Sequence, residues 1–230
     1  MPQPLILIID QGTFSTRALV FDTQGQVRAT ASRKITLTGH GTDKVEQDAA
    51  EIMASVHQVV DEVLQSAIVK EAEITCAGLT TQRSSVVAWD RRSGQPLAPL
   101  LSWQDRRVAA WLQQFEAETA KVKELTGLRL SPHYGAGKLR WYLDHVPAVS
   151  QAYTEGYLAF GPLAAFILFN LLKDRPLAVD HVNASRTQLW NLASRDWDPW
   201  LLQMFGVPLK ALPLCQPTQY TYGRLASTAI

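Results

Sequence analysis

Two apolar segments joined by a short polar turn lie at the start of the chain and constrain its fold more than any other feature. Residues 5–9 are all aliphatic and residues 18–21 are apolar, while the turn between them carries Asp10, Gly12 and Arg17. Such segments around a tight polar turn are typical of a β-hairpin. The sequence therefore predicts an opening pair of antiparallel strands whose connection presents polar groups.

The residue types in this turn suit a phosphate chain with its metal. Asp10 can face a hydrated Mg²⁺, because hard cations prefer oxygen ligands. Gly12 lets backbone amides approach phosphate oxygens closely, and Arg17 can neutralise their charge. Three hydroxyl side chains can donate to the same oxygens: Thr13, Ser15 and Thr16. Asp and Gly are also common turn residues, so an ordinary hairpin turn is the alternative interpretation.

Composition sets further limits. With 230 residues, 47% of them hydrophobic, the chain can bury the core of one large domain or two small ones. A net charge of +1 gives no electrostatic reason to expect nucleic acid or an anionic membrane as the main partner. The two cysteines, Cys76 and Cys215, form no disulfide or zinc pattern, and we expect Cys76 to be a small core residue.

A cytoplasmic location is expected. The N-terminus leads directly into the first strand and leaves no room for a signal peptide. The longest apolar stretch, residues 163–172, is about half the length that spans a bilayer. Asp22 is expected to be a turn residue, and the Arg106-Arg107 pair to be solvated charges at a helix start.

Apolar periodicity predicts the remaining elements. A third strand over residues 27–35 continues the meander, and an amphipathic helix follows over residues 48–69. Asp48 is the expected N-cap of this helix, with Glu51 as its capping-box partner. Strands are then expected over residues 74–79 and 86–89, which gives a mixed sheet with helices packed on it.

The second half is expected to be mostly helical. Helices are predicted over four segments, the third of them apolar on all sides and therefore buried: residues 105–118, 135–146, 163–172 and 199–205. Gly206 is the expected C-cap of the last helix. No periodicity follows residue 208, so no element is predicted there.

Several later segments share a pattern with a known family. They are Gly78 to Asp90 with Gln82-Arg83 at their centre, Leu101 to Arg107 with Trp103-Gln104-Asp105, Thr126-Gly127-Leu128, Pro132-His133-Tyr134, Lys138 to Trp141, and Asn183 to Thr187. Together with the opening hairpin, the whole chain resembles the amino-terminal domain of the FGGY carbohydrate kinases, and most of all glycerol kinases. The resemblance implies an α/β, ribonuclease-H-like domain of the actin and sugar-kinase superfamily spanning residues 1–230.

The resemblance also implies a function. FGGY kinases use ATP and Mg²⁺ to phosphorylate a sugar or polyol in a cleft between two such domains. The carboxy-terminal domain holds most of the adenosine site, and the general base lies in a Gly-Asp-Gln motif. Neither is found in these 230 residues, so the isolated chain is expected to be inactive.

Site residues follow from the same resemblance. The phosphate and nucleotide loop is expected to comprise Asp10, Gln11, Gly12, Thr13, Phe14, Ser15 and Arg17, with Asp10 facing the metal. The substrate side is expected to comprise Gln82, Arg83, Ser84, Trp103, Gln104, Asp105 and His133. Arg83 is the candidate catalytic residue, since its guanidinium can donate two hydrogen bonds to hydroxyl oxygens.

Two positions depart from the glycerol-kinase pattern, which has Glu where this chain has Ser84 and Tyr where it has His133. A short hydroxyl cannot replace a carboxylate acceptor without leaving space or a water. His133 and Trp103 also have interpretations without a functional role, as a surface-loop residue and as a core residue respectively. The segment from Asn183 to Thr187 is interpreted as a structural turn.

The sequence leaves two further functions open. One is a truncated, non-catalytic sugar-binding or regulatory module, and the other is an actin- or chaperone-type ATPase domain, which does not explain the Trp103-Gln104-Asp105-Arg106 segment. A homodimer is a possible assembly.

Overall fold

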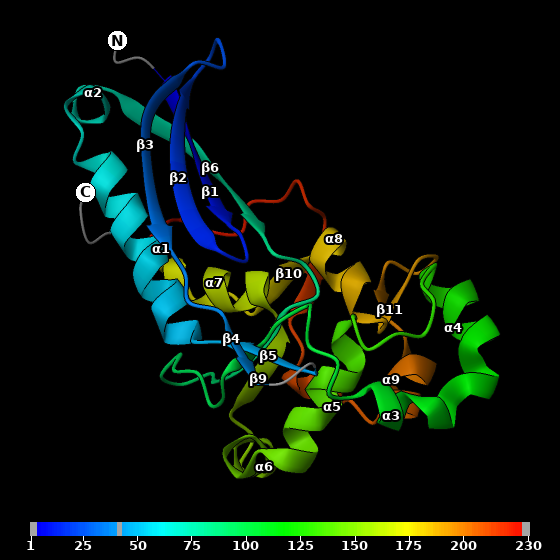
Figure 1. Ribbon diagram of the computed structural model, residues 1–230. Coiled ribbons are helices and arrows are strands. Elements are labelled where there is room, and N and C mark those ends of the chain that lie inside the picture. The colour runs from blue at the N-terminus through cyan, green and yellow to red at the C-terminus, as the bar shows by residue number, and fades with distance from the viewer. Residues whose placement is uncertain (1–3, 41–42, 227–230) are drawn as a thin grey trace.

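A four-stranded mixed sheet forms the upper part of the computed structural model, which describes residues 4–40 and 43–226 (Figure 1). Its strand order is β3-β2-β1-β6, with β1 antiparallel to β2 and parallel to β6. The strands are β1 (Pro4–Gln11), β2 (Ser15–Asp22), β3 (Val27–Lys34) and β6 (Glu73–Thr81). The predicted opening meander is confirmed, and Asp22 is a turn residue whose Oδ1 accepts from the amides of Gln24 and Gln26.

The helix after the meander covers one face of this sheet. Helix α1 (Ala49–Leu64) packs against β2 and β3 through an apolar stripe that includes Ile52, Val56 and Val60. Its N-cap is Asp48, as predicted, since Oδ1 accepts from the amide of Ala50 at 2.8 Å. The predicted capping box is wrong, because Oε1 of Glu51 instead accepts from the amide and hydroxyl of Thr36. The helix ends at Leu64, and a separate short helix, α2 (Ala67–Lys70), follows.

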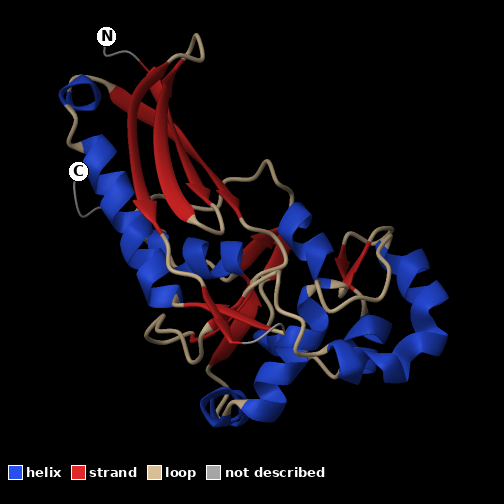
Figure 2. Ribbon diagram, in the orientation of Figure 1, coloured by secondary structure: helices blue, strands red, loops and turns tan. Residues whose placement is uncertain are grey.

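A second sheet lies below the first and has the order β4-β5-β8-β7-β9 (Figure 2). Its strands are β4 (Thr38–His40), β5 (Lys44–Gln47), β8 (Leu100–Leu101), β7 (Val86–Asp90) and β9 (Leu158–Pro162). Helix α7 (Leu163–Leu171) contacts β6 of the first sheet and both β7 and β9 of the second. It is buried along nearly its whole length, as its uniformly apolar sequence predicts, and the buried apolar residues of the chain form one connected core.

The remaining helices lie beside and below the second sheet (Figure 1). They are α3 (Ala109–Leu112), α4 (Thr119–Thr126), α5 (Gly135–His145), α6 (Pro147–Thr154), α8 (His181–Ala184) and α9 (Pro199–Phe205), with 3₁₀ turns at Gln113–Glu118, Ser185–Thr187 and Leu209–Ala211. Helices α5 and α9 match the predictions, and Gly206 ends α9 in the left-handed conformation at φ 64°.

Three further expectations about the fold are wrong. Residues 105–118 are not one helix: the segment starts as a turn held by the Asp105 carboxylate, and only Ala109–Leu112 is α-helical before the 3₁₀ turn. Residues beyond 208 include β13 (Leu214–Gln216), which pairs in parallel with β10 (Ala178–Asp180). Cys76 is exposed, because it lies on β6 at the edge of the first sheet.

One further pair of short strands completes the described structure, β11 (Trp190–Asn191) and β12 (Asp196–Trp197). Over residues 4–40 and 43–226, no helix is both long enough and apolar enough to cross a membrane.

The hydroxyl of Tyr142 should stabilise the junction of α5 with the second sheet. This fully buried group donates to the carbonyl of Pro99 at 2.6 Å and accepts from the amide of Leu101 at 3.1 Å. Tyr142→Phe leaves the buried amide of Leu101 without this partner and removes the hydrogen bond to Pro99, so we expect the free energy of unfolding in urea to fall by about 1–3 kcal/mol. Tyr153→Phe is the matched control, because Tyr153 is 47% exposed, and it should change nothing. Equal stability of the two variants would contradict this assignment.

Candidate active site

A cavity of about 540 Å³ lies where the ends of β1 and β6 meet the segments that follow β8, α4 and α8. Its lining residues come from five separate parts of the chain: Asp10, Gln11, Gly12, Thr13, Thr81, Gln82, Arg83, Ser84, Trp103, His133 and Arg186. Most of the residues that the sequence singled out are thus brought together.

The parallel pairing of β1 with β6 explains why the two principal segments meet. Gln11 pairs with Thr81, and the amide of Gln82 donates to the carbonyl of Gln11 at 2.7 Å. Since parallel strands end at the same edge of a sheet, the turn after β1 and the loop after β6 emerge side by side.

The turn after β1 is short, and its backbone is tightly packed at Gly12. The amide of Gly12 donates to the carbonyl of Ser15 at 2.9 Å, and a Cβ at position 12 would lie 3.3 Å from that oxygen. Phe14 is 65% exposed at the tip of the turn and, with Ser15, lies outside the cavity lining. Thr16 points the other way, fully buried with its hydroxyl 2.7 Å from that of Ser55, so the idea that it donates to a phosphate is wrong.

Arg17 binds the carboxylate of Asp10 across the hairpin. Its Nε donates to Oδ2 at 3.1 Å, and its terminal nitrogen also donates to Oδ2. Oδ1 of Asp10 has no hydrogen bond within the part of the chain that the structure describes, which leaves it available to a ligand. Arg17 itself does not line the cavity.

A buried network of glutamine side chains holds the turn in place. The side-chain nitrogen Nε2 of Gln82 donates to Oε1 of Gln47 at 2.8 Å and to Oε1 of Gln11 at 3.2 Å. Gln47 in turn donates to the carbonyl of Thr13 at 2.8 Å. Because buried amides are costly to leave unpaired, this network resists displacement of the turn.

Trp103 forms a wall of the cavity and contacts two of its other parts. Its indole Nε1 donates to Oγ1 of Thr13 at 2.9 Å, and its ring centroid lies 5.6 Å from that of His133. Burial and the positive charges of Lys138 and Arg186 lower the pKa of His133 below its usual value. This shift favours the neutral imidazole, which offers one donor and one acceptor.

Gln104 and Asp105 lie outside the cavity lining, although the sequence groups them with Trp103. Asp105 is fully buried, and its carboxylate accepts from the amide of Val45 at 2.7 Å and from the guanidinium of Arg107. This geometry makes Asp105 an anchor of the loop that carries Trp103.

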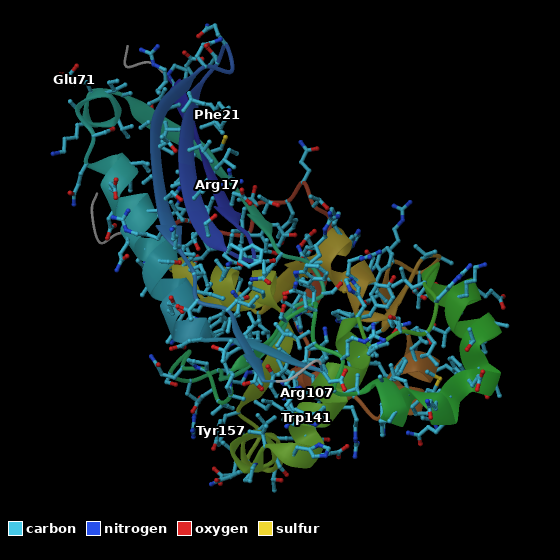
Figure 3. All side chains as sticks on the ribbon, in the orientation of Figure 1. Arg17, Phe21, Glu71, Arg107, Trp141 and Tyr157 are labelled. Carbon is cyan, nitrogen blue, oxygen red and sulfur yellow. The ribbon has the colours of Figure 1, made fainter. Side chains whose placement is uncertain are left out.

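Arg107 is 4% exposed, so the expectation of a solvated charge is wrong for this residue. It binds both Asp105 and Glu46 and lies 4.4 Å above the ring of Trp141, beside it in Figure 3.

Lys138 is a residue whose role the sequence did not reveal. It is fully buried, and its Nζ donates to the carbonyl of Ser102 at 2.7 Å and to that of His133 at 2.9 Å. These carbonyls belong to the two segments that supply Trp103 and His133, so a single amine fixes one wall against the other. Burial lowers its pKa to about 7, with Asp105 opposing the shift. A neutral amine has two N–H donors, enough for both carbonyls.

Thr81 and Arg186 were also missed. The segment from Asn183 to Thr187 was interpreted as a structural turn, yet the hydroxyl of Thr81 donates to Oδ1 of Asn183 at 3.2 Å and the following turn places Arg186 in the lining. A lone Arg after a helix carries no signal that distinguishes it from a surface charge.

Ser84 lines the cavity with a hydroxyl that has no hydrogen-bond partner. It is 3% exposed, and its backbone has a φ of 68°, in the left-handed region. A buried polar group without a partner is costly, which points to a ligand or water as its missing partner.

The described residues contain no cluster of three or more His, Cys, Asp or Glu side chains that could hold a metal by themselves. Among the described lining residues Asp10 is the one carboxylate. A single carboxylate suits Mg²⁺ held also by water and by the phosphates of a ligand.

Comparisons with known proteins agree on one family. Residues 5–230 match the model of the N-terminal domain of the FGGY family of carbohydrate kinases. The chain is 40% identical over 210 residues to a glycerol kinase of Acinetobacter baylyi, covering 90% of this chain and 42% of that one. It is 39% identical over 224 residues to a glycerol kinase of Rhodospirillum centenum, covering 96% and 45%.

Solved structures show the same fold. The crystal structure of Plasmodium falciparum glycerol kinase with ADP matches with a TM-score of 0.92 at 26% identity, over 98% of this chain and 46% of that one. Xylulose kinase from Rhodospirillum rubrum matches with a TM-score of 0.85 at 25% identity, over 98% and 45%. The predicted actin and sugar-kinase type of fold is confirmed, and the chain spans less than half the length of these relatives.

Removal of the Lys138 amine should lower the free energy of unfolding by an amount that depends on pH. Lys138→Met leaves the buried carbonyl of Ser102 and the half-buried carbonyl of His133 without this donor, so we expect the free energy of unfolding to fall by about 2–5 kcal/mol. The folded pKa is about 7, whereas an unfolded lysine titrates near 10.4. Between pH 7 and 10.4 the lysine is protonated in the unfolded chain but largely neutral in the folded one, so the stability of the wild type rises with pH. The difference in free energy of unfolding between the wild type and the variant should therefore grow as the pH rises.

Urea unfolding at pH 7, 8.5 and 9.5 tests this expectation. Lys123→Met is the control, because Lys123 is exposed on α4. A deficit that stays constant with pH would contradict the assignment of a lowered pKa to Lys138.

Proposed function

The chain belongs to the FGGY family of carbohydrate kinases, and we propose that it is the substrate-side domain of an ATP-dependent kinase that phosphorylates a hydroxyl of a sugar or polyol. One observation carries the proposal: the turn after β1 and the residues Arg83, Trp103 and His133 line a single cavity. Phosphoryl transfer requires positioning and charge neutralisation, and this cavity brings both kinds of group together.

Each segment has a role in this proposal. The hydroxyl of Thr13 binds phosphate oxygens of the nucleotide, and Gly12, which has no side chain, lets them approach the turn closely. Arg83 donates to hydroxyl oxygens of the acceptor, and the indole of Trp103 packs against its carbon backbone. Arg17 acts by holding the Asp10 carboxylate, which is the contact that the structure gives it.

Magnesium fits the free oxygen of Asp10. The cation, bound through water and phosphate oxygens as well, would neutralise the charge of the transferred group. Asp10 is then the residue of this domain that sets the position of the metal.

We propose that a second domain completes the enzyme, since the relatives are more than twice as long. That domain supplies the adenosine site and the general base, and its closure over the cavity excludes water as a competing acceptor. We also propose that the whole protein is cytoplasmic and forms a homodimer.

A second candidate is a non-catalytic module that binds a sugar without phosphorylating it. Ser84 and His133, where glycerol kinases resembling this chain have Glu and Tyr, favour it. The DNA that follows the codon for Ile230 decides between the two: a continuing frame with a Gly-Asp-Gln motif and a second domain supports the kinase, and an immediate stop supports the module.

The isolated 230-residue chain should not bind ATP tightly, because the proposed adenosine site lies in another domain. Titration calorimetry with MgATP is expected to give a dissociation constant no lower than millimolar. Low-micromolar affinity would show that these residues suffice for nucleotide binding.

In the longer protein, Asp10→Asn should lower kcat by at least about 100-fold, because metal-borne charge stabilisation is worth several kcal/mol and each 1.36 kcal/mol is a factor of ten. Asp22→Asn makes the same chemical change at the far end of β2, where an Asn oxygen can still accept from the amides of Gln24 and Gln26. It should retain activity. Similar losses in both variants would speak against a metal role for Asp10.

A further inference from the structure

Lys138 is fully buried next to the cavity and lies outside its lining. Its Nζ donates to the carbonyl of Ser102 at 2.7 Å and to that of His133 at 2.9 Å, and among the described residues these are the only two groups that accept from it. Trp103 follows Ser102 directly, so the amine holds together the two backbone segments whose rings pack against each other in the cavity wall.

The number of acceptors around Nζ suits a neutral amine. A neutral amine has two N–H donors, whereas an ammonium has three, and the third would be buried without an acceptor in the described chain. Hydrogen bonds from an ammonium are individually stronger, but a buried charge without a full set of partners is costly. Protonation of Lys138 therefore favours the entry of water beside Nζ and the separation of the two segments.

The charges around Lys138 do not offset this cost. Asp105 attracts an ammonium at this position, but its carboxylate already binds the guanidinium of Arg107, which repels one. Burial is the largest effect and lowers the pKa of Lys138 to about 7. The other charged or titratable groups around these residues are Glu46, His133, Tyr142 and Arg186.

We propose that Lys138 is a proton-sensitive positioning residue: its neutral amine holds Trp103 and His133 in place to bind the acceptor, and its protonation loosens them. The inference rests on the proposed function, because Trp103 and His133 belong to the proposed acceptor side of the cavity. It adds regulation of that side by pH, through a side chain that does not line the cavity. Acceptor binding is then strongest above pH 7 and weakens as the pH falls.

Nuclear magnetic resonance of the 230-residue chain tests this coupling without any ligand. Between pH 5.5 and 9, the indole Nε1–H signal of Trp103 should shift with the same midpoint as the ¹³Cε signal of Lys138, near pH 7. The Cε1–H signal of His133 gives the separate midpoint of that ring, whose pKa is lowered. A Trp103 signal that does not change with pH, or that follows His133 instead, would overturn the inference.

Matched variants assign the titration to the amine. Lys138→Gln keeps two N–H donors but cannot be protonated, so its Trp103 signal should lose the midpoint near pH 7. Lys123→Gln makes the same change at an exposed position of α4 and should titrate like the wild type. Circular dichroism checks that both variants are folded, and if Lys138→Gln does not fold, the wild-type titrations decide. A midpoint that persists in folded Lys138→Gln contradicts the assignment.

Kinetics of the longer protein, with MgATP and with glycerol as the acceptor, separate positioning from a general structural role. If the acceptor binds only when Lys138 is neutral, the KM for glycerol should fall about ninefold from pH 6 to pH 8, because the competent fraction rises from about 0.1 to about 0.9. In Lys138→Gln this dependence should vanish, whereas the KM for MgATP should keep its wild-type pH profile. Equal pH profiles for glycerol in the two proteins would overturn the inference.

The two experiments keep the possible failures apart. If the longer protein transfers no phosphate from MgATP to glycerol or to any other polyol or sugar, the proposed function fails, while a coupled titration of Lys138 and Trp103 in the 230-residue chain still supports the inference. Phosphoryl transfer by a protein whose Trp103 signal is independent of Lys138 supports the proposed function and overturns the inference.

Discussion

The parallel pairing of β1 with β6 is the interaction on which the rest of the site depends. It brings Gln11 opposite Thr81, so the residues that follow each strand share one edge of the sheet. In this register β1 buries Leu5, Leu7 and Ile9 against the core. The strand pairing therefore sets where the polar residues at the ends of the strands lie.

Below that edge, buried polar groups do the positioning. The glutamines at 11, 47 and 82 hold the turn, Lys138 holds the Trp103 loop against His133, and Asp105 with Arg107 anchors the same loop from behind. Each of these groups is satisfied within the described chain, whereas the Ser84 hydroxyl is not. The contrast separates side chains that hold the cavity walls together from Ser84, whose hydroxyl is left to pair with a ligand or water.

Local periodicity predicted the elements that pack one apolar face, namely the opening hairpin, α1, α5, α7 and α9. It failed where a specific hydrogen bond decided the backbone. The turn at Asp105 interrupts a helical pattern, and the side chain of Glu51 accepts from Thr36 instead of capping its own helix. Strand β13 forms because it pairs with β10, which is distant in sequence. Most of the cavity could be anticipated from the family resemblance. Arg186 and the role of Lys138 could not, because their neighbours in space are distant in sequence.

The contact between Trp103 and Thr13 constrains how the hydroxyl of Thr13 can form hydrogen bonds. An indole N–H can only donate, so Oγ1 of Thr13 must act as the acceptor in their 2.9 Å hydrogen bond. The proton of that hydroxyl is then left over, and it can be offered only to an electron-rich atom. A tryptophan in the wall of the cavity thus occupies one acceptor position of the threonine hydroxyl and leaves its proton to be donated to an oxygen above the turn.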